Sequence, residues 1–285
     1  MRYKSLNSFL NLASTKLNPK GPYALVLVED AIEIDATIAY CQKIGFREVI
    51  VFGGPGLLPL DDAQIHAVEQ DMHHAGALTS VVNAMIRKFP HVWMHYCYNG
   101  EFLYFPFCET RNVREMIAFN VEERRDTVLT YVIDLYSIDL GKHPNAVSLD
   151  SAHLDRAGYY ALARMPDGKI KDRQLDFYGG LRWRFEEHVP WTRRKIDRVG
   201  LFKAKKGLEL LEDHTFNIEE YNTYSCEWHN SISATICSFR TAKALLSNPG
   251  SMYEIPHFWW KNSEKFEWNS NQLLELGLME PGQWF

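Results

Sequence analysis

The chain has 285 residues, of which 46% are hydrophobic, and its 31 basic and 36 acidic side chains give a net charge of −5. This length fits one large domain or a core domain with a second lobe, and the mild charge without a basic stripe argues against a nucleic-acid partner. No apolar run approaches the ~20 residues of a membrane helix, and the N-terminus lacks the apolar core of a signal peptide, so we expect a cytoplasmic protein with no transmembrane segment. The five cysteines are an odd number without close pairs, which predicts free thiols.

The first strong pattern follows a short N-terminal extension, residues 1–21. Tyr23–Val28 is a continuous apolar run typical of a buried strand, and Glu48–Phe52 is a second one. Between them, apolar residues recur every three or four positions, which predicts a helix, and Asp30 with Glu33 three positions later resembles its N-terminal capping box. A strand–helix–strand unit of this kind predicts two neighbouring parallel strands.

The alternation continues to about residue 140. The spacing predicts helices over 65–75, 78–89 and 113–119, strands over Val92–Tyr98 and Val128–Leu135, and a turn at Asn99-Gly100. We therefore expect an α/β fold, with a mixed, mostly parallel sheet flanked by helices. Ligands of such sheets bind at the carboxyl ends of the strands, where Asp30, Asn99 and Glu101 would lie.

Residues 141–285 are less regular, with a helix predicted over Ser233–Leu246. Their densest motif is Gly179-Gly180 followed by Arg182, Arg184 and His188. On a strand, arginines two positions apart point to the same side, and paired guanidiniums bind phosphate oxygens well. The alternative is a basic surface strand whose arginines pair with Glu186-Glu187.

Two aspartates near the end of the strand over Val128–Leu135 are candidates for a catalytic base. Asp134 has apolar neighbours on both sides, whereas Asp139 lies farther along the following segment. A carboxylate in a partly desolvated cleft can remove the proton of an attacking hydroxyl. We expect Asp134 to be the better candidate, with two solvated loop acids as the alternative.

Three stretches carry a resemblance to a known family: Val26–Gly53, Trp93–Leu103 and, more weakly, Ser238–Lys243. The first two resemble family 2-like glycosyltransferases of the GT-A fold, in the bacterial glycosyl transferase family 2 group, over about half the chain. The resemblance implies a Rossmann-like GT-A fold, a nucleotide-sugar donor bound by residues 22–140, and a glycan or other hydroxyl acceptor bound by residues 141–285.

The resemblance also implies roles for individual residues. Asp30 and Asn99 would contact the donor, and Glu101 with His214 would hold a Mg²⁺ or Mn²⁺ ion at the diphosphate. The chain departs from the family at its Asp-x-Asp motif, because Tyr98 and Gly100 stand where the two aspartates would be. One carboxylate is a poor set of ligands for a hard cation, so we expect weak metal dependence, with Arg182 and Arg184 as the other means of stabilising the diphosphate.

Two alternatives to a glycosyltransferase stay open. The missing aspartates favour a non-catalytic relative that binds sugar nucleotides or glycans. A structural-zinc protein of other function would use Cys226, His229 and Cys237, with His214 or His257 as the fourth ligand, although zinc ligands are usually paired at short spacing.

Overall fold

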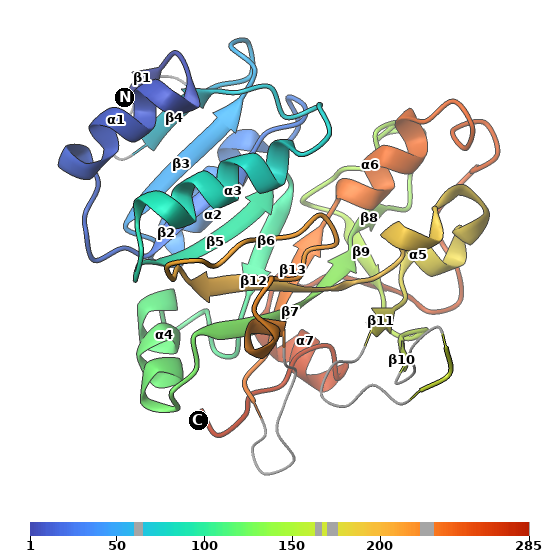
Figure 1. Ribbon diagram of the computed structural model, residues 1–285. Helices are drawn as coiled ribbons and strands as arrows, with labels where there is room; N and C mark the ends of the chain where they lie inside the picture. Colours follow the sequence, from blue (N-terminus) through green and yellow to red (C-terminus); the bar gives the residue numbers. More distant parts are fainter. Residues whose placement is uncertain (60–64, 163–166, 170–175, 223–230, 285) are drawn as a thin grey trace. The chain divides into compact units, whose positions relative to one another are not determined.

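The computed structural model describes residues 1–59, 65–162, 167–169, 176–222 and 231–284 (Figure 1). Its contacts divide the chain into two compact units. Unit 1 contains Met1–Phe102, Thr110–Val128 and Val199–Asn222, and unit 2 contains Leu103–Glu109, Leu129–Arg198 and Thr223–Phe285. The expected regions 1–21, 22–140 and 141–285 were divided by function, and this division stays a prediction.

Unit 1 is built on parallel strands in the order β1-β4-β3-β2-β5, with β12 antiparallel to β5. The predicted pairing of the first two long strands is confirmed, since Tyr23 to Leu27 of β2 pair in parallel with Glu48 to Phe52 of β3. The strand bounds are β1 Arg2–Tyr3, β2 Tyr23–Leu27, β3 Glu48–Gly53, β4 Ile65–Glu69, β5 Trp93–Tyr98, β6 Glu101–Tyr104 and β12 Asp197–Lys203.

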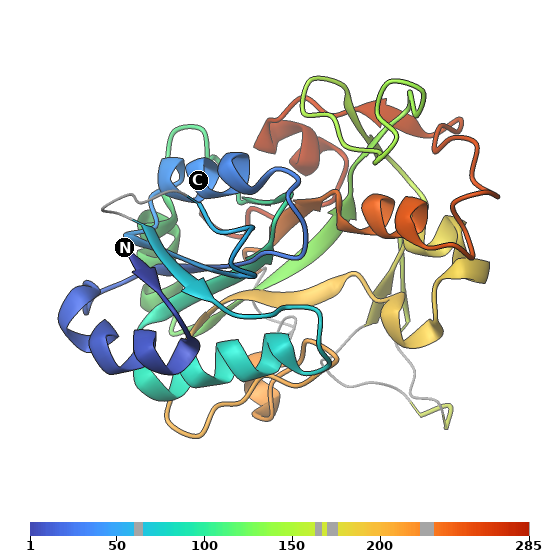
Figure 2. The ribbon, with the colours of Figure 1, turned by 90° about the horizontal axis from the view of Figure 1, so that it is seen from above.

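Helices cover both faces of this part of the sheet, as the view from above shows (Figure 2). The helices of unit 1 are α1 Leu6–Lys16, α2 Ile34–Lys43, α3 Ala77–Lys88 and α4 Val113–Glu122. Buried apolar side chains of α1 and α3, such as Phe9 and Met85, share one cluster with Leu25 and Leu27 of β2. Burying each such side chain contributes roughly 1.5–3 kcal/mol, so this face is a main source of stability. The α/β class with a mostly parallel mixed sheet is therefore confirmed.

The predicted helix over 65–75 is wrong, because Ile65–Glu69 forms strand β4. The strand is almost wholly buried between β3 and β1, so its apolar residues need not alternate, and a spacing of three or four then mimics a helix. His66 on this strand is 2% exposed and lies in the core.

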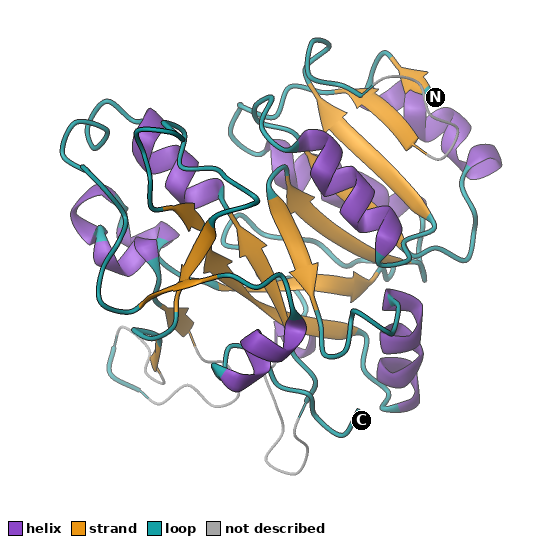
Figure 3. Ribbon diagram, turned by 180° about the vertical axis from the view of Figure 1, so that it is seen from behind, coloured by secondary structure: helices purple, strands orange, loops and turns teal. Residues whose placement is uncertain are grey.

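Unit 2 combines several smaller elements (Figure 3). Within unit 2, Ala234 to Ser238 of β13 pair in parallel with Thr130 to Asp134 of β7. A second sheet has the antiparallel order β14-β9-β8, and β10 pairs with β11. The bounds are β7 Thr127–Asp134, β8 Tyr136–Ser137, β9 Ala152–Asp155, β10 Tyr160–Leu162, β11 Asp176–Tyr178, β13 Ala234–Ser238, β14 Ser263–Lys265, α5 Leu181–Arg184, α6 Arg240–Ser247 and α7 Ser270–Glu275.

The predicted helix over Ser233–Leu246 is half right. Ala234–Ser238 is strand β13, and the helix α6 begins only at Arg240. The five strand residues are all buried, so polar and apolar side chains do not alternate and no period of two marks the strand. In the part of the chain that the structure describes, the cysteines 41, 97, 108 and 237 are free thiols, and no helix is long and apolar enough to cross a membrane.

Candidate functional site

The strand order of unit 1 reverses between β2 and β5. From β2 the chain continues through α2 to β3 and then β4 on one side, and α3 returns it to β5 on the other side. Ligands of open α/β sheets bind outside the carboxyl ends of the two strands where the order reverses. The residues that follow these ends are Glu29-Asp30 after β2 and Asn99-Gly100 after β5.

Asn99 joins the two strand ends. Its Nδ2 donates hydrogen bonds to Asp30 Oδ1 at 2.7 Å and to the Ile32 carbonyl at 2.7 Å, and its Oδ1 accepts one from the Glu29 amide at 2.9 Å. The Asn99 side chain is fully buried, whereas Glu29 and Asp30 are half-buried. The structure thus brings together two of the residues expected to bind a donor, with Asp30 on the more exposed side.

Asp30 does not cap the helix as predicted. Its Oδ1 accepts from the Ile32 amide at 2.8 Å, which forms a tight turn, and α2 starts only at Ile34 after Glu33, whose φ is 56°. No side chain caps the first turn of α2. Asp30 is therefore held to the strand ends by Asn99 and by its own turn.

Glu101 is folded back onto its own turn. Its Oε2 accepts a hydrogen bond from the Tyr98 amide at 2.8 Å, and the side chain is 1% exposed. The intervening Gly100 has a φ of 80° and donates its amide hydrogen to Thr37 Oγ1 at 2.8 Å. A single buried carboxylate that already accepts a backbone hydrogen bond does not fit a divalent ion that needs about six oxygen ligands.

The second expected metal ligand, His214, has Tyr96 as its partner. The two rings stack at 5.9 Å between centroids, and His214 Nδ1 lies 3.1 Å from the Tyr96 hydroxyl. Among the described residues, no group of three or more histidine, cysteine, aspartate or glutamate side chains is arranged to hold a metal. Of the three residues in the zinc alternative, Cys226 and His229 lie outside the described residues, and Cys237 is buried on β13.

In unit 2, Asp134 ends strand β7 and is 1% exposed. Its Oδ2 accepts from the Leu181 amide at 3.0 Å, and its Oδ1 lies 3.8 Å from Arg182 Nε. Burial raises the pKa of Asp134 above its usual range, and the positive charge of Arg182 opposes this only in part. The other candidate base, Asp139, lies on an exposed loop beside Lys142.

Arg182 and Arg184 lie on the short helix α5 and not on a strand, so the geometry expected for a phosphate clamp is wrong. The Gly179-Gly180 pair sets this conformation, because both residues have positive φ and the chain turns directly into α5. Arg182 Nε donates to Thr241 Oγ1 at 3.1 Å, in addition to its contact with Asp134. A phosphate would therefore compete with an existing carboxylate partner.

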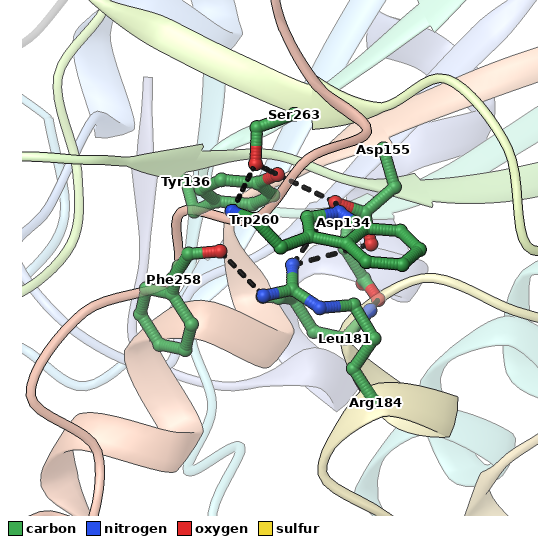
Figure 4. A network of polar contacts seen from close by, with 8 residues as sticks. All are labelled: Asp134, Tyr136, Asp155, Leu181, Arg184, Phe258, Trp260 and Ser263. Carbon is green, nitrogen blue, oxygen red and sulfur yellow. Dashed lines mark hydrogen bonds and ion pairs between the residues drawn. The ribbon is translucent and has the colours of Figure 1, made fainter.

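Arg184 belongs to a buried network that also contains the described residues Asp155, Tyr136, Trp260 and Ser263 (Figure 4). Its Nη1 lies 3.0 Å from Asp155 Oδ1, and the same oxygen accepts from Trp260 Nε1 at 2.7 Å and from the Tyr136 hydroxyl. Ser263 Oγ lies 2.7 Å from that hydroxyl. Burial raises the pKa of Asp155, and the Arg184 guanidinium acts against it.

The two glycines before α5 are needed for close approach within this unit. A Cβ on Gly180 would come within 2.8 Å of Asp134 Oδ2, and one on Gly179 within 2.2 Å of the Tyr159 ring. In the part of the chain that the structure describes, the Tyr159 hydroxyl and Asp134 Oδ1 are buried without a hydrogen-bond partner. Such groups are costly to bury, so a buried polar region with unused hydrogen-bonding capacity lies beside the glycines.

His188 lies apart from this network. Its Nε2 is 3.5 Å from Glu254 and 3.8 Å from Glu187. The predicted surface pairing with Glu186 is made by another arginine, Arg194, whose Nη1 lies 2.7 Å from that carboxylate. His188 therefore contacts acids and not the arginines with which it was grouped.

Sequence reasoning missed Asp155, Tyr136 and Tyr159. Asp155 ends the short strand β9, and its partner Trp260 is 105 positions away in the chain. No local spacing links these residues, and only the preceding apolar Leu154 hinted that Asp155 would be buried.

Comparison with known proteins adds no relative to this picture: no protein-family model matches the chain, and no curated protein matches it.

Proposed function

We propose that the protein is a glycosyltransferase that binds a nucleotide-sugar at the carboxyl ends of β2 and β5. The observation that carries the proposal is the Asp30–Asn99 pair at the place where the strand order reverses. Acidic residues beside this place bind ribose hydroxyls in other nucleotide-binding α/β sheets. A half-buried carboxylate fixed by Asn99 and the Ile32 amide is suited to that role, because its orientation is set before the ligand arrives.

In the proposed reaction an acceptor hydroxyl oxygen attacks the anomeric carbon of the sugar. The bond between that carbon and the diphosphate oxygen breaks, the nucleoside diphosphate leaves, and the proton of the hydroxyl passes to a carboxylate. We assign this carboxylate to Asp134, since burial raises its pKa and so makes it a stronger base. Glu101 and His214 are engaged with the Tyr98 amide and the Tyr96 hydroxyl and do not form a fitting ligand set for a metal ion.

A second candidate is a relative that binds a sugar nucleotide without transferring the sugar. It is favoured by the 1% exposure of Asp134 and by the carboxylate partners that Arg182 and Arg184 already have. Both candidates require the same donor site, so binding and turnover must be measured separately.

Binding is tested by calorimetric titration of UDP, GDP and their glucose or mannose conjugates into the wild type and Asp30→Asn. The amide keeps an acceptor for Asn99 and removes the charge, so the fold should survive while affinity falls about tenfold, the value of one hydrogen bond to a charged group. Asp35→Asn is the matched control, because Asp35 is exposed in the first turn of α2. Equal affinities in all three proteins would remove Asp30 from the site.

Turnover is tested with the nucleotide-sugar that binds, by following release of the nucleoside diphosphate with and without sugar acceptors. The wild type should release it, and Asp134→Asn should lose at least about 100-fold in rate while keeping donor affinity, as expected for a general base. Binding without release in the wild type would favour the non-catalytic candidate, and full activity of Asp134→Asn would assign the base to another residue.

A further inference from the structure

A basic pocket lies at the opposite, amino-terminal ends of the same strands of unit 1. It has a volume of about 150 Å³, and residues immediately before β2 and β3 and at the start of β5 contribute to it. Its basic members are Lys20, Arg47 and Arg114, and its apolar members include Pro22, Trp93 and Ile117.

The three basic side chains have no carboxylate partner. Among the described residues, none of Lys20, Arg47 and Arg114 forms an ion pair or a side-chain hydrogen bond, and all three are exposed. The neighbouring acids are engaged elsewhere. Glu48 Oε1 accepts from the Asn18 amide at 2.8 Å, and Glu115 Oε2 accepts from the Asn112 amide at 2.7 Å.

Three like charges around this volume repel one another, and no carboxylate among the described residues pairs with any of them. An anion bound among the three cations would relieve the repulsion through charge-assisted hydrogen bonds.

The apolar wall indicates what else the ligand carries. Trp93 is 6% exposed, so its ring is fixed in the core, and Pro22 is buried as well. The backbone beside it is constrained as well, since a Cβ on Gly21 would come within 2.6 Å of Val92 Cγ1. A fixed apolar wall beside three cations suits a small molecule with an anionic head and a flat apolar group.

We propose that this basic pocket binds a phosphate monoester, with the phosphate between Arg47, Arg114 and Lys20 and the apolar substituent against Trp93 and Ile117. The site is separate from the proposed donor site, because five residues of β2 span roughly 16 Å between its two ends. It does not depend on the proposed glycosyl transfer. The concave shape favours a small ligand over a membrane surface, which would need a protruding basic face.

The experiment is calorimetric titration of phenyl phosphate into the wild type, Arg47→Gln, Arg114→Gln and the double variant, at low salt. Each single substitution should weaken binding about tenfold and the double variant should abolish it, because each removes charge-assisted hydrogen bonds. Lys43→Gln, which removes one exposed charge from α2 of the same unit, should leave the affinity unchanged, as should Asp30→Asn at the other end of the strands.

Three further arms define the ligand. Inorganic phosphate should bind more weakly than phenyl phosphate if the apolar wall contributes, and raised salt should weaken both. Equal affinity of the wild type and the double variant would overturn the proposal. It would also be overturned if phenyl phosphate failed to bind while vesicles of phosphatidylserine and phosphatidylcholine bound in an Arg47-dependent way.

Discussion

The strand ends of unit 1 and the buried polar network of unit 2 differ in the groups that bind their carboxylates. At the strand ends of unit 1, Asn99 binds backbone groups and one half-buried carboxylate, so a charge stays accessible at the surface of the sheet. In unit 2, Asp134 and Asp155 are each 1% exposed, and their charges are matched by arginines within the same unit. The first arrangement can receive a ligand without rearrangement, whereas the second must give up an internal partner to do so.

This difference predicts which substitutions should change ligand affinity and which should change the free energy of unfolding. Removing one member of a buried ion pair leaves an uncompensated charge, which is costly, whereas changing a half-buried carboxylate to an amide keeps its hydrogen bonds. We therefore expect unit 2 to respond to substitution mainly in its free energy of unfolding, and the strand ends of unit 1 mainly in ligand affinity.

The largest expected effect is that of Arg184→Ala. It leaves Asp155 charged and buried, so the free energy of unfolding should fall by about 3–5 kcal/mol, as for other broken buried pairs. Arg194→Ala is the control, because its partner Glu186 is exposed and such pairs contribute at most about 1 kcal/mol. Urea unfolding followed by circular dichroism measures both, and an Arg184→Ala protein as stable as the control would contradict the contrast drawn between the units.

A smaller loss of stability is expected for Gly180→Ala. Alanine substitutions at three glycines separate the cost of backbone strain from the cost of a steric clash. Gly180 has a φ of 63° and no room for a Cβ beside Asp134, Gly207 has a φ of 80° and open space, and Gly54 has open space without a positive φ. We expect losses of roughly 3, 1 and 0 kcal/mol respectively, because only the first combines strain with a clash. Thermal unfolding of the three variants checks the order, and similar losses at Gly180 and Gly207 would show that the Asp134 carboxylate gives way.

The smallest effect is on the pH dependence of stability. Because the folded state raises the pKa of Asp134 above its usual 3.8, the folded protein binds the proton more tightly than the unfolded chain does. The contribution of Asp134 to stability therefore falls as pH rises from about 4 through the raised pKa, by at most about 1.4 kcal/mol per pH unit.

Asp134→Asn removes this term, so its stability relative to the wild type should improve as pH rises over that window. Asp139→Asn is the control, since the Lys142 amide lowers the pKa of Asp139 and its contribution to stability therefore changes only below about pH 4, which leaves its difference from the wild type flat over this window. Urea unfolding from pH 4 to pH 8 gives the difference, and a difference independent of pH would mean that Asp134 titrates alike in the folded and unfolded chain.

Local patterns predicted much of the fold. The two parallel strands were found because each is a short continuous apolar run, and the helix between them because its apolar residues recur every three or four positions. Leu78, Val82 and Met85 marked α3 by the same helical spacing. The errors at β4 and β13 fall where polar residues interrupt buried strands, since His66 and Thr235 break the apolar runs by which β2 and β3 were found.

The candidate site was predictable only in part. Asp30 and Asn99 could be placed together because both follow strands, and parallel strands end at one edge. The network around Asp155 could not, because it joins residues from distant segments that no local pattern relates. Arg182 and Arg184 were assigned to a strand because a four-residue helix is shorter than any periodic signal.

The glycine pair before α5 also gives a means of tracing ancestry. Neither position tolerates a Cβ, because one faces the Asp134 carboxylate and the other the Tyr159 ring, and both have positive φ. Selection should therefore preserve Gly179-Gly180 together with an aspartate some 46 positions earlier and an aromatic residue 20 positions earlier, even after the surrounding sequence has drifted. Chains too divergent to align along their whole length could still be recognised as related by that spacing.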